Sequence, residues 1–155
     1  MRQTLIRLFG SGPAIFFLSV GTLAGAAAIA QATPDFAMNL PQAVRGGAVA
    51  VGAVLGAGLA LWSVVALTPE RRGKALFTGG PFAVVRHPLY AAGLSFLAPG
   101  FVLWFDHWVF VAWLVLIHAV ANWAIGFEEG KMRAWFGGEW DAYAARTGRF
   151  FPKLV

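Results

Sequence analysis

Two short polar islands contain the residue types from which a binding or catalytic site could be built. The first, residues 79–90, reads Gly-Gly-Pro-Phe and then, after three apolar residues, Arg-His-Pro-Leu-Tyr. The second begins with Glu128-Glu129 and continues through Lys131 and Arg133. Each island adjoins an apolar segment of membrane-spanning character, where charge is costly unless it is paired or used. Function is therefore expected at these two islands.

The first island combines a turn with the start of a helix. Its Thr-Gly-Gly-Pro sequence at 78–81 favours a sharp turn that exposes backbone amides. Arg86 and His87 directly precede Pro88, a residue well tolerated in the first turn of a helix. The free amides and the dipole at that helix end favour an anionic group such as a carboxylate. The alternative is that Arg86 and His87 only anchor the helix at the lipid headgroups.

The second island extends a polar stripe along one helix. At about 100° per residue, His118, Asn122 and Glu129 fall within roughly 40° of one another, and we expect them to face the bundle interior. Glu128 points about 80° away from the His118 direction, so the two acids should have different partners. Glu129 is the better candidate to face a shared pocket. Two purely structural alternatives stay open. Glu128 or Glu129 could form an ion pair with Arg86 that only holds helices together, and His118 could only satisfy a hydrogen bond within the bundle.

Composition indicates the elements that must position these islands. Hydrophobic residues make up 59% of the 155-residue chain and charged residues only 12%, which is too apolar for a soluble protein. Four apolar segments stand out against the roughly 20 residues that a span requires, at 13–32, 46–67, 89–105 and 108–127. The third is short and contains Pro99-Gly100, so it is expected to be kinked, tilted or joined to the fourth as a tight hairpin, and Asp106-His107 leaves almost no loop between the two. We therefore expect an all-α, integral-membrane bundle of about four helices.

Past Glu129 the sequence becomes amphipathic. Aromatic and apolar residues alternate with charges, which predicts a cytoplasmic helix, a break at Gly137-Gly138, and a short helix on the membrane surface. The tail from Arg146 to Lys153 either folds back as a lid or only anchors the chain at the interface. The chain is thus expected to form one membrane domain, with two amino-terminal membrane helices in residues 1–75 and the site region in 76–155.

The first two apolar segments carry their own signals. The first resembles a signal peptide, but its apolar stretch exceeds the usual 7–15 residues, so it is expected to be a retained helix. The second contains Gly52, Gly56 and Gly58 at close-packing spacing, which favours tight contact between helices over dimerisation.

Basic residues predict the orientation in the membrane. The amino end, the second connection and the tail carry net charges of +2, +3 and +1, whereas the opposite side carries −1. The positive-inside rule then places both termini and both islands in the cytoplasm. The short chain, without a long substrate-recognition loop, favours a bacterial protein, so the expected location is a bacterial inner membrane. The islands would share one membrane face, so a site built from both is geometrically reasonable.

Several classes of function are not supported by the sequence. The chain has no cysteine, which excludes disulfides, thiolate metal sites and cysteine nucleophiles, and its histidines do not match a zinc-site spacing, so no metal is expected. The net charge of +5 sits in clusters beside apolar segments with no basic face interleaved with aromatics, so nucleic acid is not an expected partner. No Ser-His-Asp set, phosphate loop or dinucleotide fingerprint is apparent.

Together the motifs resemble a known family. The Gly-Pro-aromatic turn, Arg-His-Pro-x-Tyr, a Glu-Glu pair about 40 residues later, Phe-Gly-x-x-aromatic-x-x-Tyr and a terminal Arg-x-x-Pro are similar to the isoprenylcysteine carboxyl methyltransferase and phospholipid methyltransferase superfamily. The resemblance covers about residues 76–153. It implies an integral-membrane enzyme that uses S-adenosylmethionine without a Rossmann domain and binds it beneath a cytoplasmic cap formed by the tail. The implied partners are the bilayer and a hydrophobic small-molecule or lipid acceptor, with carboxylate, amine and thiol all open.

The resemblance also implies roles for individual residues. It assigns catalytic roles to Arg86 and Glu129, the acidic pair helping to hold the cofactor and to order Arg86. The implied cofactor-binding residues are Gly79, Gly80, Pro81, His87, Tyr90, Glu128 and Glu129. Two residues depart from the family pattern. Phe82 stands where the family commonly has Tyr, so a hydroxyl that could have contacted the ligand is missing, and Ala92 stands where the family has Gly.

Two other functions compete with this interpretation. The sterol reductases share a similar Arg-His and acidic-pair layout but use NADPH, and those proteins are much longer. A small membrane scaffold or transport protein is the alternative without catalysis. Its support is His118 and Asn122, which could line a polar path.

Overall fold

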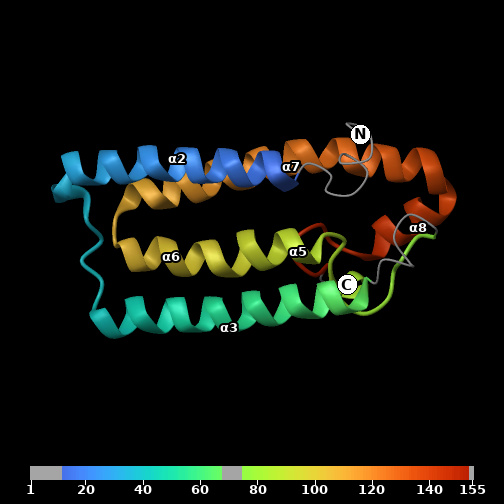
Figure 1. Ribbon diagram of the computed structural model, residues 1–155, viewed down its shortest axis with the longest axis horizontal. Helices are drawn as coiled ribbons and strands as arrows, with labels where there is room; N and C mark the ends of the chain where they lie inside the picture. The colour runs from blue at the N-terminus through green and yellow to red at the C-terminus, as the bar shows by residue number, and fades with distance from the viewer. Residues whose placement is uncertain (1–11, 68–74, 154–155) are drawn as a thin grey trace.

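A computed structural model of the chain describes residues 12–67 and 75–153 (Figure 1). These residues are mostly helical and include no strand. Within the described residues, four helices are long and apolar enough to cross a membrane, namely α2 (Gly12–Ala32), α3 (Gln42–Ala66), the third span Pro88–Phe105, and α7 (Trp108–Phe136). The predicted all-α bundle of about four membrane helices is confirmed.

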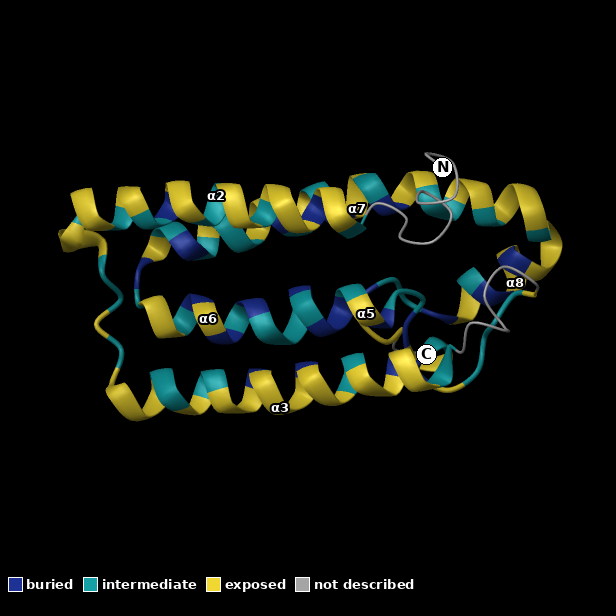
Figure 2. Cartoon of the chain, in the orientation of Figure 1, coloured by how far each residue is buried: buried dark blue, intermediate teal, exposed yellow. Residues whose placement is uncertain are grey.

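The four spans form two neighbouring pairs. α2 packs along α7, and α3 packs along the third span, which also contacts α7 (Figure 1). Outward faces carry large exposed hydrophobic side chains such as Phe17, Val54 and Trp123, and Figure 2 shows exposed positions along every span. A helix that is apolar on its outer as well as its inner face suits a lipid environment. The bundle is therefore that of an integral membrane protein.

The third span consists of three helical segments of two kinds. It consists of α5 (Pro88–Ala91), the π-helix η2 (Ala92–Leu97) and α6 (Ala98–Phe105). The wide π turns end just before Pro99, where a regular α-helix would suffer from the missing N–H and the clash of the proline ring. The segment that the sequence marked as short and kinked is thus 18 residues long and qualifies as a span.

Spans three and four form the predicted tight hairpin. Asp106 adopts a left-handed conformation with φ 56°, and His107 caps α7 by accepting a hydrogen bond at Nδ1 from the backbone N–H of Val109 (3.1 Å). The Nε2 of His107 therefore carries the proton and donates to the carbonyl of Thr33 at 2.8 Å. This buried histidine joins the hairpin to the end of α2, a role that its sequence context did not reveal.

α7 is longer than the predicted fourth segment. It continues without interruption through the second island to Phe136, because Glu, Lys, Met, Arg and Ala in this stretch are strong helix formers. The helix ends at Gly137, whose φ of 53° is easily adopted only by glycine, and α8 (Gly138–Arg146) follows. The predicted break and the short second helix are confirmed.

The glycines of α3 have unequal environments. A Cβ added at Gly52 would lie 2.6 Å from the carbonyl oxygen of Phe96, and one at Gly56 would lie 2.7 Å from Leu97 Cγ, so both glycines permit close contact with the third span. A Cβ added at Gly58 would meet nothing within 4 Å. The predicted close packing is therefore confirmed for Gly52 and Gly56 and wrong for Gly58. Gly58 lies two positions after Gly56, and two residues turn the helix by about 200°, so Gly58 faces away from the third span.

The orientation in the membrane remains a prediction. The basic residues on which it mostly depends lie outside the described residues: Arg2, Arg7, Arg71, Arg72 and Lys74, together with Glu70.

Candidate active site

The first island folds as a turn that leads into the third span. Gly80 has a φ of 56°, and the amide of Phe82 donates to the carbonyl of Gly79 at 3.1 Å, which starts the short helix α4 (Pro81–Val84). After α4 the chain extends through Arg86, and His87 is the cap residue of α5. The predicted turn and the placement of the Arg-His pair at the start of the third span are confirmed.

The tail folds back across this turn. We call residues 147–152 the strap. The backbone N–H of Arg86 donates to the carbonyl of Gly148 at 2.7 Å, and that of His87 donates to the carbonyl of Arg149 at 3.1 Å. Val85 and Gly148 also form an isolated parallel bridge. Of the two roles considered for the tail, the structure shows the folded-back arrangement.

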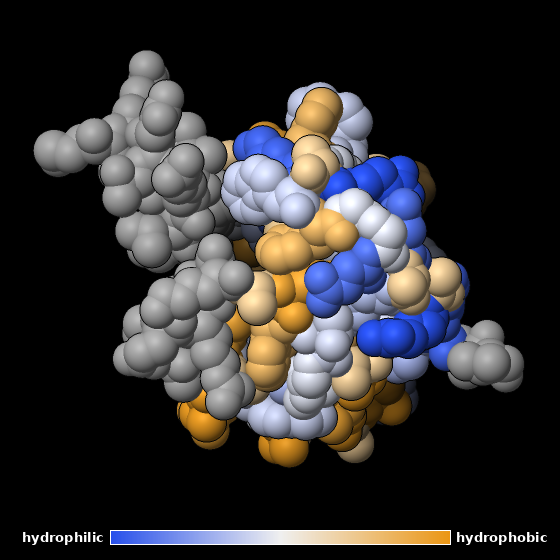
Figure 3. Space-filling model, turned by 90° about the vertical axis from the view of Figure 1, so that its right-hand side faces the viewer, coloured by the Kyte–Doolittle hydropathy of each residue, from blue (hydrophilic) through white to orange (hydrophobic). Residues whose placement is uncertain are grey.

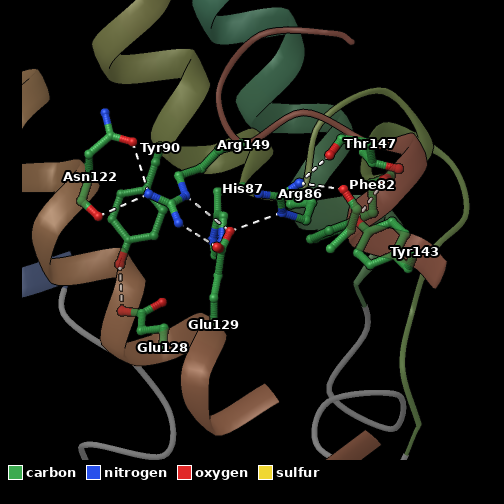
Figure 4. Close-up of polar contacts among 11 residues, drawn as sticks. Phe82, Arg86, His87, Tyr90, Asn122, Glu128, Glu129, Tyr143, Thr147 and Arg149 are labelled. Atoms are coloured by element: carbon green, nitrogen blue, oxygen red, sulfur yellow. Dashed lines mark hydrogen bonds and ion pairs between the residues drawn. The ribbon is translucent and has the colours of Figure 1, made fainter. Parts of the chain in front are cut away.

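Glu129 joins three elements at one carboxylate (Figure 4). Its Oε1 accepts hydrogen bonds from Arg86 Nε at 2.9 Å, His87 Nε2 at 3.1 Å and Arg149 Nε at 3.1 Å, and its Oε2 accepts one from Arg149 Nη2. An ionised carboxylate only accepts hydrogen bonds, so His87 carries its proton on Nε2. Only 13% of the Glu129 side chain is exposed. α7, the start of the third span and the strap therefore meet at this group.

Arg86 is oriented on both sides of its guanidinium group. While Nε donates to Glu129, Nη1 donates to the carbonyls of Ala144 (3.1 Å) and Thr147. The side chain is 11% exposed, and Thr147 is buried. Charge-assisted hydrogen bonds of this kind are roughly twice as strong as neutral ones. Arg86 thus ties the end of α8 and the strap to Glu129. Both the structural and the functional interpretations of the sequence expected an ion pair between Arg86 and one of the two acids.

The polar stripe of α7 lies under the strap. Arg149 Nη1 donates to the backbone carbonyl and to Oδ1 of Asn122, both at 3.0 Å, and the His118 ring stacks on Phe151 with 6.4 Å between ring centroids. Asn122 is exposed, so the prediction that the whole stripe faces the bundle interior is wrong at this position. The buried seam of α7 runs beside the stripe, through Ile117 and two further buried residues, Ala121 and Ile125.

The two acids have different partners, as their angular separation on the helix predicted. Tyr90 donates its hydroxyl to Glu128 Oε1 at 3.1 Å, whereas Glu129 binds the basic residues. The first island therefore contacts both carboxylates, through Tyr90 on one side and Arg86 and His87 on the other (Figure 4).

Arg149 is the site residue that sequence reasoning weighed least. It appeared only as part of the terminal Arg-x-x-Pro pattern, yet it contacts both Asn122 and Glu129. The pattern was the available signal. No sequence signal pointed to the carbonyls of Ala144 and Thr147 as partners of Arg86, because any residue can supply a backbone acceptor.

α8 covers the turn of the first island. The Tyr143 hydroxyl donates to the carbonyl of Phe82 at 2.7 Å, and the side chains of Tyr143 and Trp140 are buried. Removal from water raises the pKa of Tyr143 to about 12. Figure 3, which views this end of the molecule, shows hydrophilic residues gathered at the top and on the right of the view, and hydrophobic ones at its centre and along its lower edge.

This burial predicts an alkaline limit to stability. Between pH 10 and about 12 the unfolded chain releases the phenolic proton of Tyr143 while the folded chain keeps it, so stability falls as the pH rises through this window. Tyr143→Phe should cost about 1 kcal/mol at pH 8, through the lost hydrogen bond, and should flatten the decline above pH 10. Thermal melting of the detergent-solubilised protein from pH 8 to 11 measures both effects.

The matched control is Tyr90→Phe, which removes the only other tyrosine and should keep the decline that Tyr143 causes. Parallel stability curves for Tyr143→Phe and the unchanged protein would contradict the prediction.

A comparison with known protein families matches most of the site region. A family model described as phospholipid methyltransferase matches residues 70–139, a little under half of the chain. The match includes the whole first island and the acidic pair of the second, and it ends within α8, before the strap. No curated protein matches the chain. The resemblance to this superfamily of membrane methyltransferases, first seen in the two islands, is confirmed.

Proposed function

We propose that this protein is an integral-membrane methyltransferase that uses S-adenosylmethionine to methylate a hydrophobic or lipid-like acceptor through a carboxylate, amine or thiol. The observation that carries the proposal is the convergence of both islands on Glu129, at one end of a membrane-spanning bundle. The family match over both islands supports the same chemistry. We also propose that this end faces the cytoplasm of a bacterial cell.

The donor set of the site suits the charges of S-adenosylmethionine. The cofactor carries a positive sulfonium, a positive ammonium and a negative carboxylate. Glu128 and Glu129 complement the positive groups, and Arg86 and Arg149 complement the carboxylate. When bound, the cofactor supplies an electrophilic methyl group on its sulfonium.

The residues of the chain would then hold and orient the cofactor and exclude water from the site. Methyl transfer is an in-line displacement in which positive charge disperses, so alignment and a dry site matter more than acid–base help. We assign Glu129 to stabilise the positive charge and Arg86 to the cofactor carboxylate, with Gly79, Gly80 and Pro81 shaping the turn beside the nucleoside. His87 and Tyr90 would contact the amino-acid part. Phe150 of the strap, which is only 4% exposed, would help to exclude water.

Direct titration tests this proposal. Calorimetry of the detergent-purified protein should show binding of S-adenosylmethionine and S-adenosylhomocysteine in the micromolar range, which is usual for such ligands. Acceptors with carboxylate, amine and thiol groups on a long apolar chain would then be screened with methyl-labelled cofactor. Folded protein that binds neither cofactor form, or that oxidises NADPH instead, would contradict the proposal.

A further inference from the structure

Asn122 is a polar residue of the α7 stripe to which the proposed function gives no role. It is exposed on a membrane-spanning helix, where an amide is costly unless its polar groups have partners. Its Nδ2 donates to the carbonyl of His118 at 3.0 Å, and its Oδ1 accepts from Arg149 Nη1 at 3.0 Å. Asparagine is a weaker helix former than leucine or alanine, so helix formation does not explain this residue. The reason for an asparagine here lies in its contact with the strap.

Arg149 bridges Asn122 and Glu129 with a single guanidinium group (Figure 4). Nη1 donates to the backbone carbonyl and to Oδ1 of Asn122, both at 3.0 Å, while Nε and Nη2 donate to the two carboxylate oxygens of Glu129. Asn122 and Glu129 are seven positions apart on α7, so they lie about 10 Å apart along the helix axis and within roughly 20° of each other around it. The guanidinium group is therefore held at both ends along one side of the helix.

The hydrogen-bond donors of Arg149 are almost all in use. A guanidinium group has five N–H donors in one rigid plane. Four of them bond to Asn122 and Glu129, which leaves one hydrogen of Nη2 without an acceptor among residues 12–67 and 75–153. Because the group is planar, the two bonds at Nη1 fix the direction of that remaining donor. This donor is available to the carboxylate of the cofactor.

Glu129 by itself is a weak guide for Arg149. Its Oε1 also accepts from Arg86 and His87, so Arg149 shares this oxygen with two other donors. The Arg149 side chain is 26% exposed, against 13% for Glu129, and a long side chain loses much rotamer freedom when it is held in one orientation. A second acceptor that contacts only Nη1 orients the group without competing for the carboxylate.

We infer that Asn122 is a positioning residue, whose side-chain oxygen holds the Arg149 guanidinium against Glu129 with one donor directed at the carboxylate of the cofactor. Asn122 acts through Arg149 and does not itself contact the cofactor. The inference rests on the proposed function, and it gives this exposed member of the polar stripe a role in cofactor affinity.

Two substitutions isolate the side-chain oxygen of Asn122, and a third serves as a control. Asn122→Leu keeps the size of the side chain and removes the oxygen, and leucine is the better helix former, so the variant should fold. Asn122→Asp keeps an oxygen for Nη1 and should restore the contact. The control, Lys131→Ala, removes another exposed polar side chain of α7, two positions past Glu129.

Calorimetry and steady-state kinetics test the role in cofactor binding. Asn122→Leu should bind S-adenosylmethionine roughly tenfold more weakly, the usual effect of losing one hydrogen bond to a charged group. Because the carboxylate of the cofactor is remote from the transferred methyl group, KM for the cofactor should rise while kcat stays nearly constant. Asn122→Asp and Lys131→Ala should stay within about twofold of the unchanged protein. Equal affinity in a folded Asn122→Leu variant, as judged by its melting curve, would overturn the inference.

A double-mutant cycle with Arg149→Met distinguishes a positioning role from a purely structural one. If Asn122 acts through Arg149, adding Asn122→Leu to Arg149→Met should cause no further loss of cofactor affinity. A second loss of roughly tenfold in the double variant would show that Asn122 acts independently of Arg149, and it would overturn the inference.

Limited trypsin digestion gives a readout that needs no cofactor. Trypsin must take the Arg149 side chain into its own specificity pocket, in competition with Asn122 and Glu129. Cleavage of the detergent-purified protein after Arg149 should be several-fold faster in Asn122→Leu than in the unchanged protein, and it should keep its rate in Lys131→Ala. Equal rates in all three would overturn the inference.

The same measurements separate this inference from the proposed function. Cofactor binding by the unchanged protein, with equal affinity and equal cleavage in Asn122→Leu, would overturn the role of Asn122 alone. An unchanged protein that binds no cofactor would overturn the methyltransferase proposal and the cofactor part of the inference, while the digestion still decides whether Asn122 holds Arg149.

Discussion

Glu129→Gln is expected to lower the affinity for S-adenosylmethionine by at least about 100-fold, equivalent to roughly 2.7 kcal/mol, and to abolish detectable methyl transfer. The substitution keeps the shape of the side chain and removes the charge that Arg86, His87 and Arg149 share. Two guanidinium groups would then lack their common counter-ion, and breaking a buried ion pair is costly because the remaining charge is uncompensated. Calorimetric titration beside a methyl-transfer assay measures both losses.

The control for this experiment is Asp141→Asn. Asp141 also pairs with an arginine, Arg133 Nε at 2.7 Å, but both side chains are more than half exposed. Exposed pairs contribute little, so this variant should bind cofactor normally. A melting curve must show that Glu129→Gln is folded. If that folded variant binds the cofactor as tightly as the unchanged protein does, Glu129 is only a structural link between helices and our assignment of its role is wrong.

The double variant Gly52→Ala, Gly56→Ala is expected to lose more stability than any other pair of methyl additions on α3. The added Cβ atoms would lie 2.6 Å from the Phe96 carbonyl oxygen and 2.7 Å from Leu97 Cγ, with the Ala92 carbonyl oxygen at 2.9 Å from the second. Since two of these neighbours are backbone atoms, the helices must move apart. Overpacking of this kind costs about 1–3 kcal/mol per site. Thermal unfolding in detergent measures the loss.

Gly47→Ala and Gly58→Ala are the matched controls, because an added Cβ at either position meets nothing within 4 Å. Both should be neutral or slightly stabilising, since alanine is a better helix former than glycine. The double variant should also weaken cofactor binding, because the third span that it displaces begins directly after Arg86 and His87. Equal melting temperatures for the double variant and the controls would show that α3 and the third span do not depend on this close contact.

These two experiments address different parts of the molecule. Glu129→Gln changes charge and leaves the packing of the spans in place, whereas the glycine variants change packing and leave the charges in place. Loss of cofactor binding in the first, in a variant that still folds, would locate the chemistry at the point where both islands meet. Loss of both in the second would show that the spacing between α3 and the third span positions the Arg-His pair.

The sequence by itself determined the membrane spans and the break that ends α7. Apolar length predicts the spans, Asp106-His107 leaves room only for a tight hairpin, and Gly137 ends α7 as expected. These features depend on hydropathy and on the conformational limits of neighbouring residues, which are local properties of the chain. Helical spacing likewise predicted that Glu128 and Glu129 would have different partners.

Only the tertiary structure decided which groups meet. Glu129 contacts Arg86 across 43 positions and Arg149 across 20 positions of sequence, and Arg86 reaches the carbonyl of Thr147 across 61. Helical spacing gives the direction of a side chain from its own helix, but it does not say which helix or strap stands opposite. For that reason the exposure of Asn122, the open space beside Gly58 and the contact of Asn122 with Arg149 were not readable from the chain. They result from how the spans and the strap pack, which depends on every contact at once.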